Sequence, residues 1–146
     1  MPRKSFTDWF QSKRFHHFGV LEFTRYFERS RGNVRNSEPP RHQWENIVPA
    51  LRIVDELRAS FGKPGVLLSS YRSPAYNRAV GGASQSQHVE FTALDIRVQG
   101  VSPQRVYDRL LQWRREGRFR GGLGLYPSAG FVHIDTRPRN STWRGA

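Results

Sequence analysis

Two of the five histidines in this sequence could hold a metal ion together with a nearby carboxylate. His88 ends a polar stretch, and Asp95 follows it after six intervening residues. That separation allows a loop to fold back and bring both side chains to one place. The sequence contains no cysteine, so a transition metal would have to be bound by His, Asp or Glu.

His133, the second of these histidines, lies between two apolar residues. In a strand, Val132 and Ile134 would face the core, while His133 and Asp135 would face the opposite side together. Two histidines and one carboxylate are a frequent ligand set of catalytic zinc, whose fourth position is left to water. The spacing alone leaves another interpretation open, in which the histidines are surface residues and Asp95 is a capping or ion-paired group.

Four short segments have the character of strands and would position these residues. Residues 66–70 form a short apolar run, and residues 94–98 alternate between apolar and polar. Residues 121–126 and 130–135 are predicted to be two strands joined by a turn. Asp95 and His133 thus fall on strands, and His88 falls on a loop that follows a helical start within residues 76–87.

Two segments are predicted to be helices. Apolar residues recur at spacings of three and four from residue 44 to residue 61, and Gly62 closes this helix. Proline costs about 3 kcal/mol in a helix interior, so the helix either begins near Pro49 or is kinked there. Ser102 is a suitable N-cap for a helix to about residue 115. The order of these elements predicts an α+β domain with a small antiparallel sheet flanked by helices.

The amino-terminal part of the chain has a different composition. Aromatic residues between 6 and 29 recur at partly helical intervals, and we expect them to pack against the core rather than form a binding surface. Residues 30–41 are polar and contain Gly and Pro, which predicts an exposed loop. A chain of 146 residues fits one domain, here residues 1–146, with an amino-terminal segment over 1–43 and the core over 44–143.

The formal net charge of +12 indicates an anionic partner or environment. Nucleic acid and an acidic bacterial envelope are both candidates on charge alone. The basic residues are scattered apart from one local group, and the sequence has no recognisable nucleic-acid-reading motif or aromatic platform, so nucleic acid is not expected as a partner. That local group comprises Arg114, Arg115, Arg118 and Arg120.

The start of the chain is basic but is not followed by an apolar stretch of signal-peptide length. No run approaches the roughly 20 apolar residues of a membrane span, so we expect no membrane insertion. We expect a monomer. Export would require another route, such as release from the cytoplasm by another protein or incorporation into a virion.

Several stretches of the sequence carry a resemblance to a known family. They are residues 70–77 (SYRSPAYN), 81–83 (GGA), 86–88 (SQH) with Asp95, and 121–127 (GGLGLYP) before 131–137 (FVHIDTR). Together they resemble the zinc D-alanyl-D-alanine carboxypeptidase and L-alanyl-D-glutamate peptidase family, over about residues 44–143. This family shares its fold with the lysostaphin-type peptidases and the amino-terminal domain of hedgehog.

The resemblance implies roles for individual residues. His88, Asp95 and His133 match the positions that bind zinc in the family. Arg72 matches an arginine that stabilises the substrate carbonyl oxygen as it becomes an oxyanion, a role that suits a permanently charged donor. The alternative for Arg72 is a structural salt bridge.

The general base is where this sequence departs from the family. Many relatives carry Glu or Asp three residues before the last zinc histidine, or His two residues before it, where this chain has Gly130 and Phe131. Asp135 is the remaining carboxylate nearby, and it could take the proton from a zinc-bound water or orient His133 instead. Glu90 is a further candidate, with a solvated loop charge as its alternative.

Five other positions bear on the cleft. Phe91 replaces a Gly that is common in relatives, which could reshape the cleft. Ser86 and Gln87 are expected to position the loop that bears His88, and Tyr126 to line the groove, although turn or packing roles would explain all three. The last tryptophan, Trp143, is expected in the core or the groove wall.

The resemblance implies a zinc peptidase that acts on the peptide stems or cross-links of peptidoglycan in the periplasm or extracellular cell wall. It could be a D,D-carboxypeptidase or an endopeptidase, such as a phage-type lysin. A positive surface would draw the enzyme to an anionic envelope. The alternative is a non-catalytic domain with structural zinc that binds cell wall or protein, and Gly130 in place of the usual base favours it.

Overall fold

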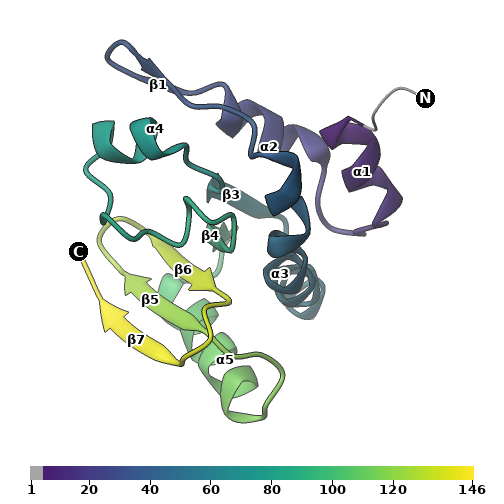
Figure 1. Cartoon of the computed structure of the whole chain (residues 1–146). Helices are drawn as coiled ribbons and strands as arrows, with labels where there is room; N and C mark the ends of the chain where they lie inside the picture. Colours follow the sequence, from purple (N-terminus) through teal and green to yellow (C-terminus); the bar gives the residue numbers. More distant parts are fainter. Residues whose placement is uncertain (1–4) are drawn as a thin grey trace.

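A five-stranded sheet forms the centre of the computed structural model, which describes residues 5–146 (Figure 1). Residues 1–4, with which the basic amino terminus begins, lie outside the described residues. The strands lie in the order β3-β4-β6-β5-β7. Their bounds are β3 Gly65–Ser69, β4 Ala93–Val98, β5 Gly122–Tyr126, β6 Phe131–Asp135 and β7 Ser141–Arg144.

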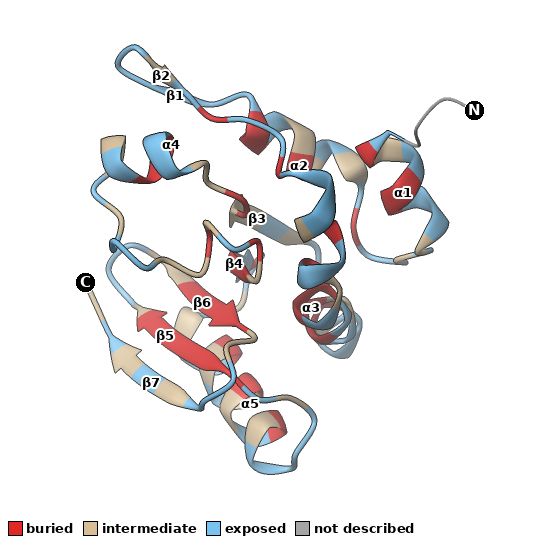
Figure 2. Ribbon diagram, in the orientation of Figure 1, coloured by how far each residue is buried: buried red, intermediate tan, exposed pale blue. Residues whose placement is uncertain are grey.

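Helices cover one face of this sheet and leave the other face to the loop before β4. The helix α5 (Pro103–Arg115) packs against β4, β5 and β6, and α3 (Val48–Phe61) packs against β4. Figure 2 shows the buried residues on β5, β6 and the inner side of α3. Leu94, Leu123 and Ile134 are fully buried, and pairing sets Leu94 and Leu123 each opposite Ile134.

The predicted α+β class is confirmed, and so are the four predicted strands and both long helices. Pro49 takes one of the first positions of α3, where its missing N–H costs nothing, and a 3-10 helix over Arg41–Ile47 precedes it. The helix is therefore not kinked at Pro49. Gly62 ends it in the left-handed conformation, with φ of 63°.

Some elements of the structure were not predicted or have other bounds than expected. Strand β7 was not predicted, and it pairs with β5 in parallel, so the sheet is not antiparallel throughout. The helical start expected within residues 76–87 is a short helix, α4 (Pro74–Ala79), which begins earlier, at the N-cap Ser73. The expected exposed loop at residues 30–41 contains a small hairpin of β1 (Ser30–Arg31) and β2 (Val34–Arg35).

The amino-terminal aromatic segment forms two helices that pack into the core, as expected. They are α1 (Phe6–Ser12) and α2 (Val20–Phe27). Phe6 contacts Trp44 and Phe91 edge-on or tilted, at ring separations of 5.4 and 6.2 Å. Among residues 5–146 no helix has the length and apolar character needed to cross a membrane.

Candidate metal centre

Strand pairing places the two predicted ligands of the sheet side by side. Asp95 of β4 is the direct partner of His133 in the antiparallel β4–β6 pair. Directly opposite residues in a sheet have side chains on the same face. The register therefore brings together two residues that lie 38 positions apart in the chain.

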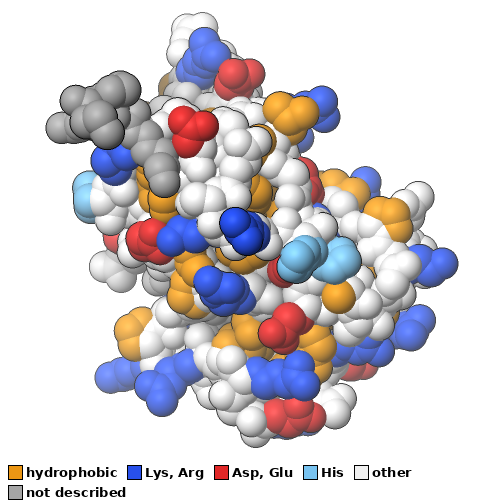
Figure 3. Space-filling view, turned by 90° about the vertical axis from the view of Figure 1, so that its right-hand side faces the viewer, with side chains coloured by type: hydrophobic (Ala, Val, Ile, Leu, Met, Phe, Trp, Pro, Cys, Tyr) orange, Lys and Arg blue, Asp and Glu red, His pale blue; other side chains and the backbone are white. Residues whose placement is uncertain are grey.

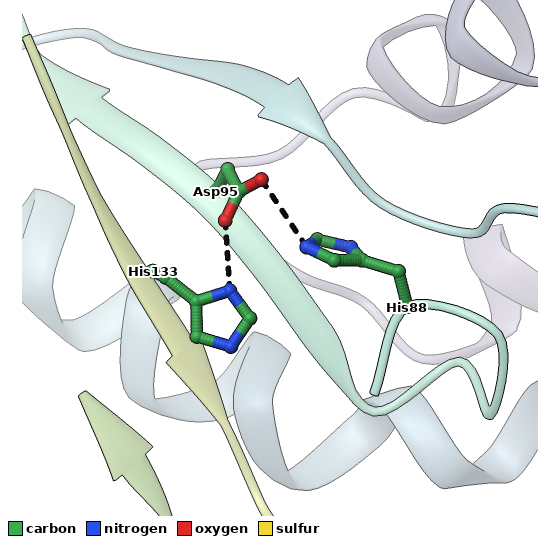
Figure 4. Close-up of side chains that lie close together, drawn as sticks. All are labelled: His88, Asp95 and His133. Carbon is green, nitrogen blue, oxygen red and sulfur yellow. Dashed lines mark hydrogen bonds and ion pairs between the residues drawn. The ribbon is translucent and has the colours of Figure 1, made fainter. Parts of the chain in front are cut away.

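His88 reaches the same place from the loop before β4. Its Nε2 lies 3.2 Å from Asp95 Oδ2, while His133 Nδ1 lies 2.9 Å from Asp95 Oδ1 (Figure 4). All three side chains are buried, and one ligand atom from each lies within 4.8 Å of the others. In the described part of the chain this is the one such group of three or more His, Cys, Asp or Glu residues.

Each histidine ring is held by an acceptor on its far side. The backbone carbonyl of Ser70 lies 2.6 Å from His88 Nδ1, and Asp135 Oδ2 lies 2.8 Å from His133 Nε2. In a neutral imidazole, an acceptor at one ring nitrogen keeps the proton there and leaves the lone pair of the other nitrogen available to a metal ion; without the metal, that nitrogen can carry a proton and donate it to Asp95. Both free nitrogens then point toward Asp95, as the ligands of a metal ion would.

The electrostatics of the site fit a cation between these groups. Burial raises the pKa of Asp95, but the charge of His88 and hydrogen bonds with His133 and His88 outweigh it and hold the pKa well below its usual range. Burial lowers the pKa of His133, but hydrogen bonds to Asp135 and Asp95 outweigh it and raise the pKa to about 8. Two nitrogens and a carboxylate oxygen are a donor set that suits zinc.

Asp135 has no free side toward the cleft. The residue is fully buried, and its Oδ1 accepts hydrogen bonds from the backbone N–H groups of Gly122 and Arg137. The Arg137 guanidinium binds both carboxylate oxygens, at 2.9 and 2.7 Å. Burial raises the pKa of Asp135, but the hydrogen bonds with His133 and Arg137 lower it below its usual range. This geometry favours the orienting role for Asp135 over the role of general base.

Arg72 lies beside the cluster and is held at three points. Its Nη2 is 3.8 Å from Asp95 Oδ2, its Nη1 donates to Asn77 Oδ1 at 3.2 Å, and its Nε donates to the Tyr26 hydroxyl at 3.3 Å. Asn77 lies in the stretch that carries the resemblance. Tyr26 belongs to α2, and nothing in its sequence surroundings distinguishes it from the other core aromatic residues.

The cluster opens into a cleft of about 490 Å³. The predicted residues Arg72, Ser86, Gln87 and Tyr126 all line it. Ser86 also accepts a hydrogen bond from the backbone N–H of His88, and Gln87 accepts one from the Thr92 hydroxyl. Ser86 and Gln87 therefore hold the His88 loop in place as well as facing the cleft.

Trp143 of β7 forms one wall of this cleft, in agreement with the expected groove wall. Its ring lies 5.1 Å from that of His133, and its Nε1 donates to the Tyr126 hydroxyl at 2.8 Å. Gly124 pairs with both His133 and Trp143, and a Cβ there would collide with the indole nitrogen. Glycine at this position is what allows the indole to lie across the sheet.

Phe91 and Glu90 both lie outside the cleft lining. Phe91 does not reshape the cleft, because its side chain is fully buried and packs edge-on against Tyr71 and Phe23 in the aromatic core. Glu90 is exposed and does not line the cleft, which fits the alternative of a solvated loop charge.

Comparisons with known proteins identify sequence relatives of this chain. The family model described as peptidase M15 matches residues 16–135. The peptidoglycan L,D-endopeptidase MepK of Escherichia coli strain K12 is 37% identical over 81 residues, which cover 52% of this chain and 42% of that protein. The probable peptidoglycan L,D-endopeptidase MepK of Haemophilus influenzae is 33% identical over 84 residues, covering 54% and 42%. The chain thus matches less than half the length of these relatives, and no solved structure gives a significant match.

Proposed function

The chain belongs to the peptidase M15 family, and on that premise we propose that it is a zinc-dependent endopeptidase that hydrolyses peptide bonds in bacterial peptidoglycan. The observation that carries the proposal is the buried His88, Asp95 and His133 cluster, which opens into a cleft beside Arg72. The names of the relatives indicate the L,D bond of the peptide as the one cut. A D,D-carboxypeptidase is the alternative specificity within the same family.

In this proposal His88, Asp95 and His133 hold the zinc, which when bound would lower the pKa of a water molecule to about 7 and polarise the scissile carbonyl. The Ser70 carbonyl and Asp135 keep the two imidazole rings in the required orientation. Arg72 donates to the substrate oxygen as negative charge develops on it. Loss of one such donor typically costs a factor of about 10² to 10³ in kcat.

A non-catalytic, zinc-containing domain that binds cell wall is the second candidate. The observation in its favour is that Asp95, already a proposed ligand, is the one carboxylate among the described residues that line the cleft. A cleft built for general-base catalysis usually offers a further group that can take a proton.

Digestion of purified peptidoglycan tests the two candidates. The protein is incubated with the wall as purified, with chelator, and with chelator followed by added zinc, and released fragments are identified by mass spectrometry. We expect fragments that disappear with chelator and in His133→Ala, return with added zinc, and persist in His16→Ala. His16 is the matched control because it is an exposed histidine outside the cluster.

The fragment masses name the bond that is cut. Arg72→Ala separates the candidates further, because we expect it to bind zinc normally and to release fragments about 10² to 10³ times more slowly. Intact peptidoglycan in the presence of stoichiometrically bound zinc would instead support the non-catalytic binding domain.

A further inference from the structure

A second hollow adjoins the cleft and shares one residue with it. It has a volume of about 470 Å³ and lies where the loop after α5 meets the turn between β6 and β7. Arg137 lines both this hollow and the cleft that contains the metal cluster. A substrate bound at the cluster could therefore extend past Arg137 into the hollow.

The hollow is lined by positive charge. Arg114, Arg120 and Arg137 line it, and no Asp or Glu is among its described lining residues. Two acidic groups close to these arginines in the sequence are already paired: Asp135 is fully buried and binds Arg137 from behind the lining, and Glu116 pairs with Arg118. The arginines that the sequence concentrates near residue 115 are therefore partly gathered at one site.

This concentration is local, because the positive charge of the chain is otherwise dispersed. On the face shown in Figure 3, Lys and Arg side chains lie interspersed with Asp and Glu. The net charge of +12 alone would not single out a binding site on that face. The hollow differs in having three guanidinium groups and no carboxylate among its described lining residues.

Two of these arginines have guanidinium N–H groups that are available to a ligand. Arg137 uses its Nε and Nη2 on Asp135, and its Nη1 has no partner among the described residues. Arg120 is exposed and has no hydrogen-bond or ion-pair partner in the described part of the chain. Arg114 is different, since it binds the carbonyls of Gly121 and Ser141 and so fixes the walls of the hollow.

The site is held in shape before any ligand binds. Asn140 accepts a hydrogen bond from the backbone N–H of Gly121 at 3.0 Å. The Arg137 guanidinium lies 5.0 Å from the centre of the Trp143 ring, in addition to its two bonds to Asp135. A fixed guanidinium loses less conformational entropy on binding an anion than a free one would.

We propose that this hollow is an anion subsite that binds a free carboxylate of the substrate peptide, through Arg120 and Arg137, beyond the bond that is cut. Phe119 and Pro138, which also line the hollow, would contact the aliphatic part of the residue that bears the carboxylate. The inference rests on the proposed function, because it takes the substrate to be a carboxylate-bearing peptide.

The test compares two forms of one substrate. Soluble peptidoglycan fragments are used with their free carboxylates, or with these converted to carboxamides. We expect wild-type protein to show a KM about tenfold lower for the carboxylate form, the effect of one charge-assisted hydrogen bond. Arg120→Gln should raise KM for that form about tenfold and abolish the preference, with kcat little changed.

Arg115→Gln is the matched control, because Arg115 is exposed at the end of α5, five residues before Arg120, but does not line the hollow. Equal KM values for Arg120→Gln and Arg115→Gln would overturn the subsite. Competition by inorganic phosphate distinguishes a general anion site from a carboxylate site. We expect phosphate to inhibit only weakly. If millimolar phosphate abolished the preference for the carboxylate substrate, the carboxylate assignment would be overturned.

Binding in chelator separates failure of the subsite from failure of the proposed function. Affinities of the uncut fragments are measured by calorimetry, where no hydrolysis is expected. A carboxylate preference that is lost in Arg120→Gln supports the subsite even if neither fragment is ever cut, in which case the endopeptidase proposal fails alone. If the protein cuts the fragments but neither kinetics nor calorimetry shows a preference for the carboxylate form, the subsite is rejected and the endopeptidase proposal stands.

Discussion

At the scale of single residues, the hydrogen bonds of Asp135 distinguish two roles that its position in the sequence could not. A general base must offer a free oxygen toward the reacting water. Asp135 instead accepts hydrogen bonds from Gly122, Arg137 and His133 and is fully buried. We therefore propose that Asp135 positions His133.

Asp135→Ala tests this assignment. We expect zinc affinity to fall about 10- to 100-fold, because residues that orient metal-binding histidines typically contribute that much. Zinc affinity is measured by competition with a chromophoric chelator. Glu90→Gln is the comparison, since Glu90 is exposed and outside the cleft, and it should match wild type. Unchanged zinc affinity with a large loss of kcat in Asp135→Ala would instead identify Asp135 as the base.

We also propose that Tyr26, which the sequence analysis did not single out, positions Arg72 through its hydroxyl. In Tyr26→Phe, Arg72 keeps its hydrogen bond to Asn77 but loses its bond to the hydroxyl. A hydrogen bond contributes about 0.5–1.5 kcal/mol, so we expect kcat to fall roughly 2- to 12-fold with KM nearly unchanged.

Kinetics of two further variants show whether Tyr26 acts through Arg72. Tyr76→Phe is the control, because Tyr76 packs edge-on against Tyr26 but no hydrogen bond joins it to Arg72. It should retain wild-type kcat. In an Arg72→Ala background the Tyr26→Phe change should have no further effect, whereas an additive loss would show that Tyr26 acts independently of Arg72.

At the scale of elements, Phe91 shows why a substitution expected to alter the cleft alters the core instead. Its φ is +57°, in the left-handed region that is costly for a residue with a side chain. This explains why Gly is suited to the position of residue 91 in the family that the sequence resembles. Here a ring occupies it and packs against Phe6, Phe23, Phe27 and Tyr71. Aromatic packing offsets the backbone strain.

The balance between strain and packing can be measured by paired substitutions. Replacing Phe91 or Phe23 by Ala should destabilise the protein by about 3–5 kcal/mol, since both rings are fully buried. In helix α2, Phe23→Gly should be about 1 kcal/mol less stable than Phe23→Ala. At residue 91 the Gly variant should be as stable as the Ala variant or more stable, because Gly relieves about 1–2 kcal/mol of backbone strain. The free energies of unfolding are measured in urea. An Ala variant more stable than the Gly variant at both positions would contradict the strain at residue 91.

Other elements show where prediction from sequence ended. Periodicity identified α3, α5 and four strands, and alternation placed Asp95 and His133 on strands whose register the structure then aligned. Strand β7 was not predicted, because Ser141–Arg144 is short and polar and is specified by its pairing with β5. Contacts made by backbone groups, such as the Ser70 carbonyl at His88, leave no mark in a single sequence.

At the scale of the whole molecule, one hydrophobic core joins the amino-terminal helices to the sheet. Its members include Phe6 and Trp9 of α1, Phe23 of α2, and Leu94 and Ile134 of the sheet. Tyr26 of α2 also reaches the cleft through Arg72. We therefore propose that residues 5–43 are an integral part of a single domain and not a separable extension.

Deletion of residues 1–19 tests this unity. The deletion removes Phe6, Trp9 and Phe10, which are all buried, and burial of an aromatic side chain contributes about 3–5 kcal/mol. The summed loss of roughly 9–15 kcal/mol is as large as the entire stability of a typical domain, about 5–15 kcal/mol. We expect the full chain to unfold in one transition seen alike by tryptophan fluorescence and far-ultraviolet circular dichroism, and the truncated chain to show no cooperative transition. The deletion leaves all three proposed zinc ligands in place. A truncated chain that still unfolds cooperatively and binds zinc with wild-type affinity would therefore show that the sheet and its metal centre form a core independent of α1.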